Sequence, residues 1–298
     1  TFLIYFGNTF ANYLRDANEK KQIRGAFSQY LSPALVEQLA EDPDKLVLGG
    51  ETKKMTFLFC DVRGFTTISE SFKSDPQGLT KLINRFLTPL TNEIINVNGT
   101  IDKYMGDCIM AFWNAPIDVD GHEKMACDAT LRMHAVMKEL NAEREKEAKL
   151  ENKKYLELKI GIGLNTGGCV VGNMGSDQRF DYSVLGDAVN LASRLEGLTK
   201  SYGVKILCSE STVNKFTKDH HIIRDLDTIR VKGKKEPIRI YQLMRPDFLE
   251  DGRHIQEFVQ LFSEMRRLYQ ERQWKAAHSV LLECKKISPI RPNCIIFF

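Results

Sequence analysis

The fold of this chain is decided by the stretch Met55-Thr56-Phe57-Leu58-Phe59-Cys60-Asp61-Val62-Arg63-Gly64. Its first six residues are almost all apolar, which predicts a short strand that is buried on both faces. Asp61 follows this strand directly. A carboxylate in that place is costly unless it is solvated, caps a turn or binds a cation. The stretch therefore predicts a buried strand with a candidate functional carboxylate at its end.

A helix and a hairpin are predicted next along the chain. Residues 76–97 carry apolar side chains at helical spacing, and Asn98-Gly99 ends the pattern. Thr100–Met105 and Cys108–Trp113 have the composition of strands, and Gly106-Asp107 between them is typical of a tight turn. This interpretation places a second aspartate, Asp107, at the tip of a hairpin.

Two interpretations of Asp61 and Asp107 remain open at this point. Each aspartate alone is explained as a capping or turn residue. Together they offer the oxygen ligands that Mg²⁺ prefers, beside substrate phosphates. Two such ions can hold the attacking and leaving oxygens of a phosphoryl displacement. The spacing of the two residues does not show that their carboxylates meet.

The remaining pattern mixes helices and strands. The expected elements are a helix over 120–150, a strand over Tyr155–Leu164, an irregular glycine-rich stretch over Gly167–Gly175, a strand over Phe180–Leu185, a helix over Asp187–Leu198, short strands with one helix over 204–244, and two helices over 254–287 divided near Gln273. A hairpin between long helices favours an α+β fold with a largely antiparallel sheet flanked by helices.

The helix that begins near Asp187 carries a polar pair. Asn190 and Arg194 are four residues apart and share one face, while Leu191 and Leu195 face the core. The pair lies in the first turns of the helix, near the positive end of its dipole. Arginine there suits a phosphate, and asparagine suits a sugar oxygen. The alternative is a surface arginine paired with Glu196 or another neighbour.

Composition excludes several classes of protein. Hydrophobic residues make up 43% of the 298 residues and charged residues 27%, which excludes global disorder. The net charge of +3 argues against a dedicated nucleic-acid binder. Seven dispersed cysteines without a C-x-x-C pair predict reduced thiols in the cytoplasm, not a disulfide framework.

With these pieces the chain resembles the class III nucleotidyl cyclases, and in particular the catalytic domain of bacterial-type adenylyl cyclases. The resemblance rests on four motifs in order: Phe59–Thr66, Lys103–Asp107, Tyr182–Arg194 and Val231–Lys234. It implies a ferredoxin-like α+β core. It also implies a head-to-tail homodimer in which each active site draws residues from both chains.

The resemblance assigns the metal and transition-state roles by position. Asp61 and Asp107 would hold two divalent cations, Mg²⁺ or Mn²⁺, with help from the backbone carbonyl of Val62. Asn190 would orient the ribose. Arg194 would stabilise charge on the α-phosphate in the transition state. These residues would convert ATP to 3′,5′-cyclic AMP and pyrophosphate.

The same resemblance assigns base and phosphate recognition. Lys103 and Ser183 would contact the base, and Lys232, or alternatively Lys234, would bind the terminal phosphates. Lysine is a pure donor and suits N1 of adenine, while a serine hydroxyl can accept from its amino group. Lys103 therefore favours ATP over GTP. Ser183 departs from the commoner Asp or Thr, and in the family a hydroxyl residue there marks the branch that bicarbonate stimulates.

Two other functions stay open as alternatives. The first is a guanylyl cyclase, which Lys103 disfavours. The second is a catalytically silent module that binds nucleotide or only dimerises. Such modules usually lose a metal-binding aspartate or the Asn/Arg pair, and this chain retains all of them. The pattern Gly161-Ile162-Gly163 resembles a dinucleotide-binding loop but lacks the spacing of the last glycine, and a strand is expected there.

Three regions are expected along the chain. Residues 1–48 form a connecting helix, 49–246 the catalytic domain, and 247–298 a helical hairpin that resembles a truncated tetratricopeptide unit. The chain opens with the apolar run Phe2–Phe6 and no initiator methionine, and we expect a fragment of a longer protein. The run is interpreted either as the end of a membrane helix or as part of an amphipathic helix. A membrane would thus contact this cytoplasmic region only through a segment before residue 1.

Overall fold

The computed structural model describes residues 48–176, 178–214, 221–231, 236–244 and 254–287. The expected N-terminal helix lies outside these ranges, and so do Lys232 and Lys234. Six cysteines fall within the ranges and all six are free thiols. Within the described part of the chain, no helix is both long enough and apolar enough to cross a membrane.

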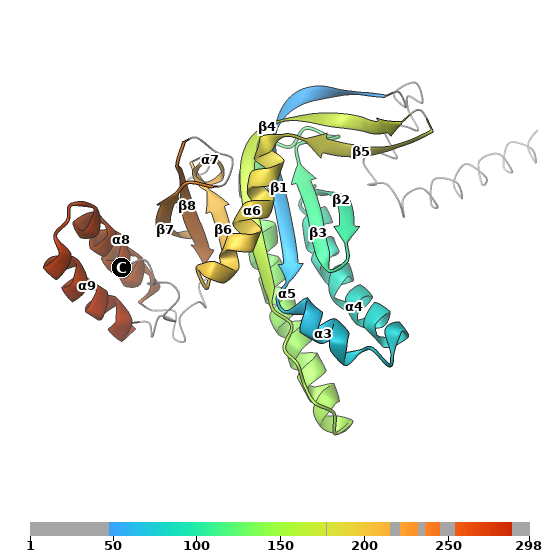
Figure 1. Cartoon of the computed structure of the whole chain (residues 1–298), viewed down its shortest axis with the longest axis horizontal. Helices are drawn as coiled ribbons and strands as arrows, with labels where there is room; N and C mark the ends of the chain where they lie inside the picture. The colour runs from blue at the N-terminus through green and yellow to red at the C-terminus, as the bar shows by residue number, and fades with distance from the viewer. Residues whose placement is uncertain (1–47, 177, 215–220, 232–235, 245–253, 288–298) are drawn as a thin grey trace, which may run out of the picture.

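Eight strands form a single sheet (Figure 1). Their bounds are β1 Gly49–Val62, β2 Thr100–Met105, β3 Cys108–Trp113, β4 Ile160–Ser176, β5 Arg179–Leu185, β6 Ile206–Ser209, β7 Ile222–Ile229 and β8 Ile238–Met244. The order across the sheet is β2-β3-β1-β4-β6-β8-β7, and β5 pairs with β4 outside this path. Among the described strands, the β4–β6 pair is parallel and the other pairs are antiparallel. The predicted α+β class with a mostly antiparallel sheet is confirmed.

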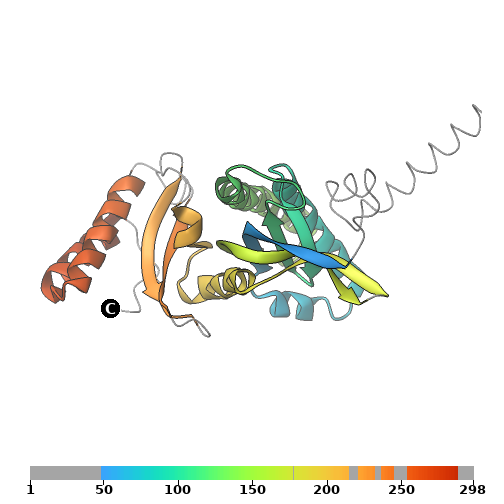
Figure 2. The same ribbon diagram turned by 90° about the horizontal axis from the view of Figure 1, so that it is seen from above.

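Helices flank this sheet on both faces (Figures 1 and 2). Their bounds are α3 Phe65–Ser71, α4 Pro76–Ile95, α5 His122–Leu150, α6 Asp187–Ser201, α7 Glu210–Val213, α8 Ile255–Gln270 and α9 Trp274–Ile287. The predicted hairpin has the observed strand bounds, and the predicted long helices over 76–97 and 120–150 agree with α4 and α5 to within two residues. Helix α4 begins at the Asp75 cap, whose carboxylate accepts a hydrogen bond from the Gly78 N–H at 2.9 Å.

The apolar run of β1 is buried on both faces because two separate clusters cover it. Leu58 and Cys60 face the cluster that contains α4 and α5 residues. Phe57 and Phe59 face the opposite cluster, which contains Val189 of α6. Successive side chains of a strand point to opposite faces, so a strand covered on both sides needs a continuous apolar sequence.

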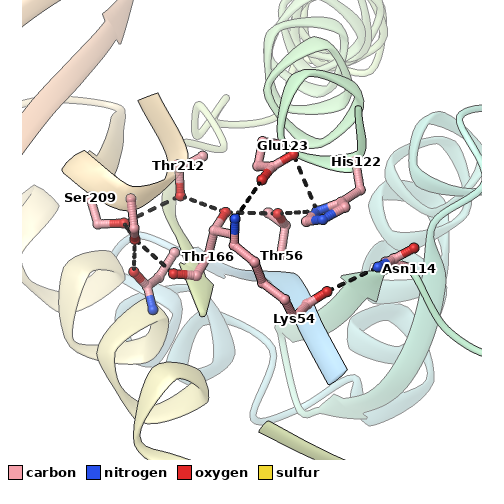
Figure 3. A network of polar contacts seen from close by, with 10 residues as sticks. Lys54, Thr56, Asn114, His122, Glu123, Thr166, Ser209 and Thr212 are labelled. Carbon is pink, nitrogen blue, oxygen red and sulfur yellow. Dashed lines mark hydrogen bonds and ion pairs between the residues drawn. The ribbon is translucent and has the colours of Figure 1, made fainter. Parts of the chain in front are cut away.

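Thr56 interrupts this apolar run, and a buried polar network satisfies it (Figure 3). Its hydroxyl lies 2.7 Å from His122 Nδ1 and 2.8 Å from the hydroxyl of Thr166. Thr166 in turn lies 3.0 Å from the hydroxyl of Thr212. The network joins β1 and β4 to the starts of α5 and α7, so the buried hydroxyls hold neighbouring elements in register.

Two expectations about β4 are wrong. The glycine-rich stretch Gly167–Gly175 is continuous strand rather than irregular structure, because it pairs with β1 on one side and β5 on the other. The strand begins at Ile160 rather than Tyr155. The Asn141 side chain of α5 accepts from the Leu158 N–H at 3.0 Å and donates to its carbonyl at 2.7 Å. The backbone N–H and C=O of Leu158 are therefore bonded to a helix side chain, and the strand begins after them.

Gly163 has a packing role in β4. A methyl group on this residue would overlap the backbone of α6 at Ala192 and Glu196. The glycine therefore allows α6 to lie directly against the strand. The resemblance of this stretch to a dinucleotide-binding loop arises from helix packing on a strand, as the alternative interpretation expected.

The C-terminal helices α8 and α9 pack against the end of the sheet (Figure 1). Phe258 and Phe262 of α8 share a buried cluster with residues of β7 and β8. The buried Arg224 of β7 lies with its guanidinium carbon 4.3 Å from the Phe262 ring centroid, and Arg266 of α8 donates to Asp225 at 2.7 Å. The break predicted near Gln273 is confirmed, while the tetratricopeptide-like nature of the hairpin remains a prediction.

The contact between α6 and β4 gives a first prediction. Gly163→Ala should lower the free energy of unfolding by about 1–3 kcal/mol, because the added methyl group meets backbone that cannot rotate away. Gly197→Ala, in α6 itself, is the matched control, since its methyl group meets nothing within 4 Å. We expect the control to raise stability by up to about 1 kcal/mol.

Urea denaturation of both variants, followed by circular dichroism, measures the difference. Equal stability of the Gly163→Ala and Gly197→Ala proteins would contradict the close contact between α6 and β4.

Candidate active site

Asp61 and Asp107 meet at one end of the central strands. Asp61 lies near the end of β1, where Cys60 pairs with Ile109 of β3. Asp107 lies in the turn between β2 and β3, and Gly106 beside it adopts a left-handed conformation with φ of 66°. The carboxyl groups of Asp61 and Asp107 lie close enough for the charge of Asp61 to act on Asp107 and for the two groups to share a proton. The structure thus settles the question that spacing left open, namely whether the two carboxylates come together.

This contact is electrostatically costly. Burial, followed by the negative charge of Asp61 and the proton that the two groups can share, raises the pKa of the Asp107 carboxyl to about 6. The N–H groups of Asp107 and Val62 oppose the shift by donating to the carboxyl group. Two carboxylates in contact share a proton or bind a cation, because both cannot be charged at low cost.

The donor set at this end fits a divalent cation of the Mg²⁺ type. Asp107 Oδ2 is buried and has no hydrogen-bond partner among the residues that the structure describes. Over the same residues, no group of three or more His, Cys, Asp or Glu side chains is placed to hold a metal ion. Two carboxylates plus backbone oxygen are what Mg²⁺ uses when water and substrate phosphates supply its other ligands.

Glu196 of α6 is a third carboxyl group near this pair, and the sequence analysis missed a role for it near the metal site. Burial and the charges of Asp61 and Asp107 raise the pKa of Glu196 to about 7, against the opposing effect of Arg63. The Glu196 carboxylate reaches this position because α6 packs on the two glycines of β4, Gly161 and Gly163. In the sequence, the only signal for this approach of Glu196 to the two aspartates is the glycine pair in the strand that α6 covers.

Lys103 and Ser183 are brought together from different strands. Lys103 lies on the edge strand β2, and Ser183 pairs with Gly172 of β4 as part of β5. The strands β2 and β5 are in contact. Asp102 lies near both residues: Lys103 Nζ is 3.4 Å from Asp102 Oδ2, and the Ser183 hydroxyl is close enough to lower the pKa of the Asp102 carboxyl.

Asn190 and Arg194 lie on the predicted helix, α6, which begins at Asp187. Asn190 is exposed in the first turn, and Arg194 is half-buried. Arg194 Nη1 is buried without a hydrogen-bond partner among the described residues. The cation that lowers the pKa of Glu196 is Arg63, so the alternative pairing of Arg194 with Glu196 is not observed. An unpaired guanidinium nitrogen suits an anion.

The site residues therefore fall into separate groups. Asp61 and Asp107 form one, and Lys103 with Ser183 forms another. Within the described ranges, no hydrogen bond or ion pair is observed that connects these groups to each other or to Arg194. Val62, whose carbonyl the resemblance assigns to the metal, is buried next to Asp61. Lys232 lies outside the described residues.

Comparison with known proteins settles the family. A family model described as the adenylate and guanylate cyclase catalytic domain matches residues 49–245. The chain belongs to the adenylate and guanylate cyclase family. This one domain accounts for both the fold and the sequence motifs from Phe59 to Lys234.

Curated relatives and solved structures agree with this assignment. The cyclase is 35% identical over 231 residues to an adenylate cyclase of Anabaena cylindrica, covering 76% of this chain and 44% of the relative. It is 31% identical over 192 residues to adenylate cyclase 1 of Rhizobium meliloti, covering 64% of this chain and 28% of the relative. The chain thus spans less than half the length of these relatives.

Among solved structures, the cyclase resembles the adenylyl cyclase CyaB from P. aeruginosa, with 37% identity and a TM-score of 0.57. That match covers 66% of this chain and 97% of the other. It also resembles the guanylyl cyclase Cya2, with 32% identity, a TM-score of 0.56, and coverage of 66% and 94%. The predicted class III cyclase fold is confirmed.

The carboxylate contact predicts a measurable coupling. In the cyclase freed of divalent cations, Asp61→Asn should lower the pKa of Asp107 from about 6, because it removes the adjacent negative charge. The raised pKa means that the folded state binds more protons than the unfolded state between pH 3.8 and about 6. Stability should therefore fall as pH rises through this window, and fall less in Asp61→Asn.

Carbon-detected NMR titration of the aspartate carboxyls provides the measurement. The exposed Glu70→Gln substitution on α3 serves as the control and should leave Asp107 unchanged. An Asp107 pKa that is the same in Asp61→Asn and in the native chain would show that the carboxylates do not interact.

Proposed function

We propose that this chain is an adenylyl cyclase domain that converts ATP to 3′,5′-cyclic AMP and pyrophosphate. The observation that carries the proposal is the contact between Asp61 and Asp107, whose buried Oδ2 has no other partner among the described residues. The family assignment supports the reaction class, and the adenylate cyclases among the relatives support the nucleotide.

Asp61, Asp107 and the carbonyl of Val62 would hold two divalent cations, Mg²⁺ or Mn²⁺. The bound ions would supply activation of the ATP 3′-hydroxyl and charge neutralisation on the triphosphate. The two carboxylates fix the position of that chemistry because one ends a buried strand and the other is held in a tight turn. Because the carboxylates are fixed in place, binding of ATP would also place its 3′-hydroxyl in line for displacement at the α-phosphorus.

The remaining residues bind and orient the nucleotide. Asn190 would hold the ribose. Arg194 would place its unpaired guanidinium nitrogen against the α-phosphate, where charge grows in the transition state. Lys232 would bind the terminal phosphates. Lys103 would donate to N1 of adenine, while Ser183 would accept from its amino group.

Catalysis would take place in a head-to-tail homodimer. Lys103, Ser183 and Arg194 of one chain would complete a site with Asp61 and Asp107 of the other, which gives two equivalent sites. Among the described residues of one chain, no hydrogen bond or ion pair is observed between these groups, as expected if they meet across a dimer. Large apolar side chains are also exposed around β2 and the β4–β5 arm, namely Tyr104, Met105, Val170 and Leu185, as expected of a face that a partner covers.

One observation favours a second candidate, guanylyl cyclase. The structural similarity to the guanylyl cyclase Cya2 is almost as strong as that to the adenylyl cyclase CyaB. Against it stands Lys103, because a lysine donor faces the N1 proton of guanine rather than an acceptor.

The intracellular supply of ATP agrees with a cytoplasmic site of action for the domain.

The direct test is product identification. The purified chain, incubated with ATP or GTP and Mn²⁺ or Mg²⁺, should form cyclic AMP from ATP with a higher kcat/KM than cyclic GMP from GTP. Chromatography with mass detection identifies the product. Preferential formation of cyclic GMP would establish the second candidate, and no cyclic product from either nucleotide would leave a silent module.

The shared site is tested by mixing two inactive variants. Asp61→Ala should abolish turnover, and Arg194→Ala should lower kcat more than it changes KM, because the arginine acts mainly in the transition state. When the two variants are combined, one site of each heterodimer keeps both intact groups, so activity should return.

Differently tagged chains verify that the heterodimer has formed before activity is measured. A verified heterodimer without activity would rule out sites composed of residues from both chains.

A further inference from the structure

The strand that carries Lys103 is irregular at the residue before it. Ile101 pairs with Ala111 of β3, whereas Lys103 pairs with the adjacent Met110, so Asp102 is an extra residue in β2. In a regular strand, neighbouring side chains point to opposite faces, and Asp102 would point away from Lys103. A bulge changes this direction, and bulges of this kind often aim a side chain at an active site.

Asp102 is deeply buried although the bulge lies on an edge strand. Its side chain is only 1% exposed, while that of Lys103 is 45% exposed. Neither Asp102 oxygen has a partner at normal hydrogen-bond distance within the described residues. Two donors lie near it: the Lys103 ammonium, 3.4 Å from Asp102 Oδ2, and the Ser183 hydroxyl, which is close enough to lower the pKa of the carboxyl group.

The charge on this carboxyl group depends on the same neighbours. Burial raises the pKa of Asp102, and the Ser183 hydroxyl and the Lys103 ammonium lower it. A buried carboxylate is expensive unless donors face it. The donors near Asp102 are Lys103 and Ser183, which are the two residues that we assign to base recognition. The Asp102 carboxylate and this pair therefore depend on each other.

We propose that Asp102 is a positioning residue that fixes the polarity of Ser183 and thereby makes the site specific for adenine. The inference rests on the proposed function, since it deepens the base recognition of that site. A carboxylate can only accept, so the Ser183 proton is directed to Asp102. The serine lone pairs then face the nucleotide.

This arrangement gives the serine a defined role. A free hydroxyl donates or accepts equally well and would tolerate both the amino group of adenine and the carbonyl of guanine. With its proton held by Asp102, Ser183 presents an acceptor alone, which matches the adenine amino group and repels the guanine carbonyl. The Asp102–Ser183 pair thus presents only an acceptor to the base, as an aspartate at position 183 would. Asp102 also neutralises Lys103 without blocking its exposed ammonium.

The test compares kcat/KM for ATP and for GTP. Asp102→Ala should lower the ATP-to-GTP ratio by about tenfold, because the serine is then free to donate. Asp102→Asn keeps one acceptor oxygen and should give an intermediate ratio, and it replaces the alanine variant if that protein does not fold. Asp181→Ala removes an exposed carboxylate of β5 that also acts on Asp102, and it should leave the ratio within about twofold.

A double-mutant cycle shows whether Asp102 acts through the hydroxyl. Ser183→Ala alone should lower the ratio, and adding Asp102→Ala to it should lower the ratio no further. Ser183→Thr keeps the hydroxyl and should keep the ratio. An unchanged ratio in folded Asp102→Ala, an equal fall in Asp181→Ala, or a second independent fall in the double variant would overturn the proposal.

Failure of the proposed function is recognised separately. If the native chain turns over neither nucleotide, the cyclase proposal fails, and the same variants are then compared by competition of ATP and GTP for a bound fluorescent nucleotide. A preference for ATP that Asp102→Ala abolishes and Asp181→Ala does not would still support the role of Asp102. A preference that survives Asp102→Ala would overturn it.

Discussion

The whole domain depends on the antiparallel ladder between β1 and β4. This ladder runs without interruption from Gly49 opposite Asn173 to Val62 opposite Ile160. A slip of one residue would turn Phe57 and Leu58 to the wrong faces, so the two apolar clusters fix the register. One end of the ladder holds Asp61, and the other forms the arm with β5, which contacts β2. Sheet pairing thus positions Asp61 on β1 and, through the pairing of β4 with β5, Ser183.

The site is an arrangement that the fold holds at an electrostatic cost. Asp107 contacts Asp61, and Glu196 lies close enough for their charges to raise its pKa together with burial. A second unfavourable feature is the Asp102 carboxylate of β2, which is almost wholly buried. Such violations of ordinary stability rules cluster at functional sites, because a bound ligand satisfies the groups that the folded chain leaves strained. In the proposed function, divalent cations would neutralise the first group, and Lys103 and Ser183 with the bound base would satisfy the second.

Local patterns predicted the elements well, and tertiary contacts account for the errors. The hairpin of β2 and β3, the helices α4 and α5, and the start of α6 all follow from periodicity and turn residues. The glycine-rich part of β4 was misjudged because glycine suggests irregular backbone, whereas here it pairs on two sides. Within the site, motif order identified the candidates. Glu196 and Asp102 were missed as site residues because their roles depend on a helix and a strand distant in sequence.

The central claim is that Asp61 and Asp107 are held together in order to bind divalent cations with the nucleotide. Electron paramagnetic resonance of Mn²⁺, titrated into the chain with an ATP analogue that cannot cyclise, tests it most directly. The account predicts Mn²⁺ bound by the native chain in excess of that held by the analogue alone, and loss of this binding in Asp107→Asn. Equal Mn²⁺ binding by the native chain and by Asp107→Asn would contradict it.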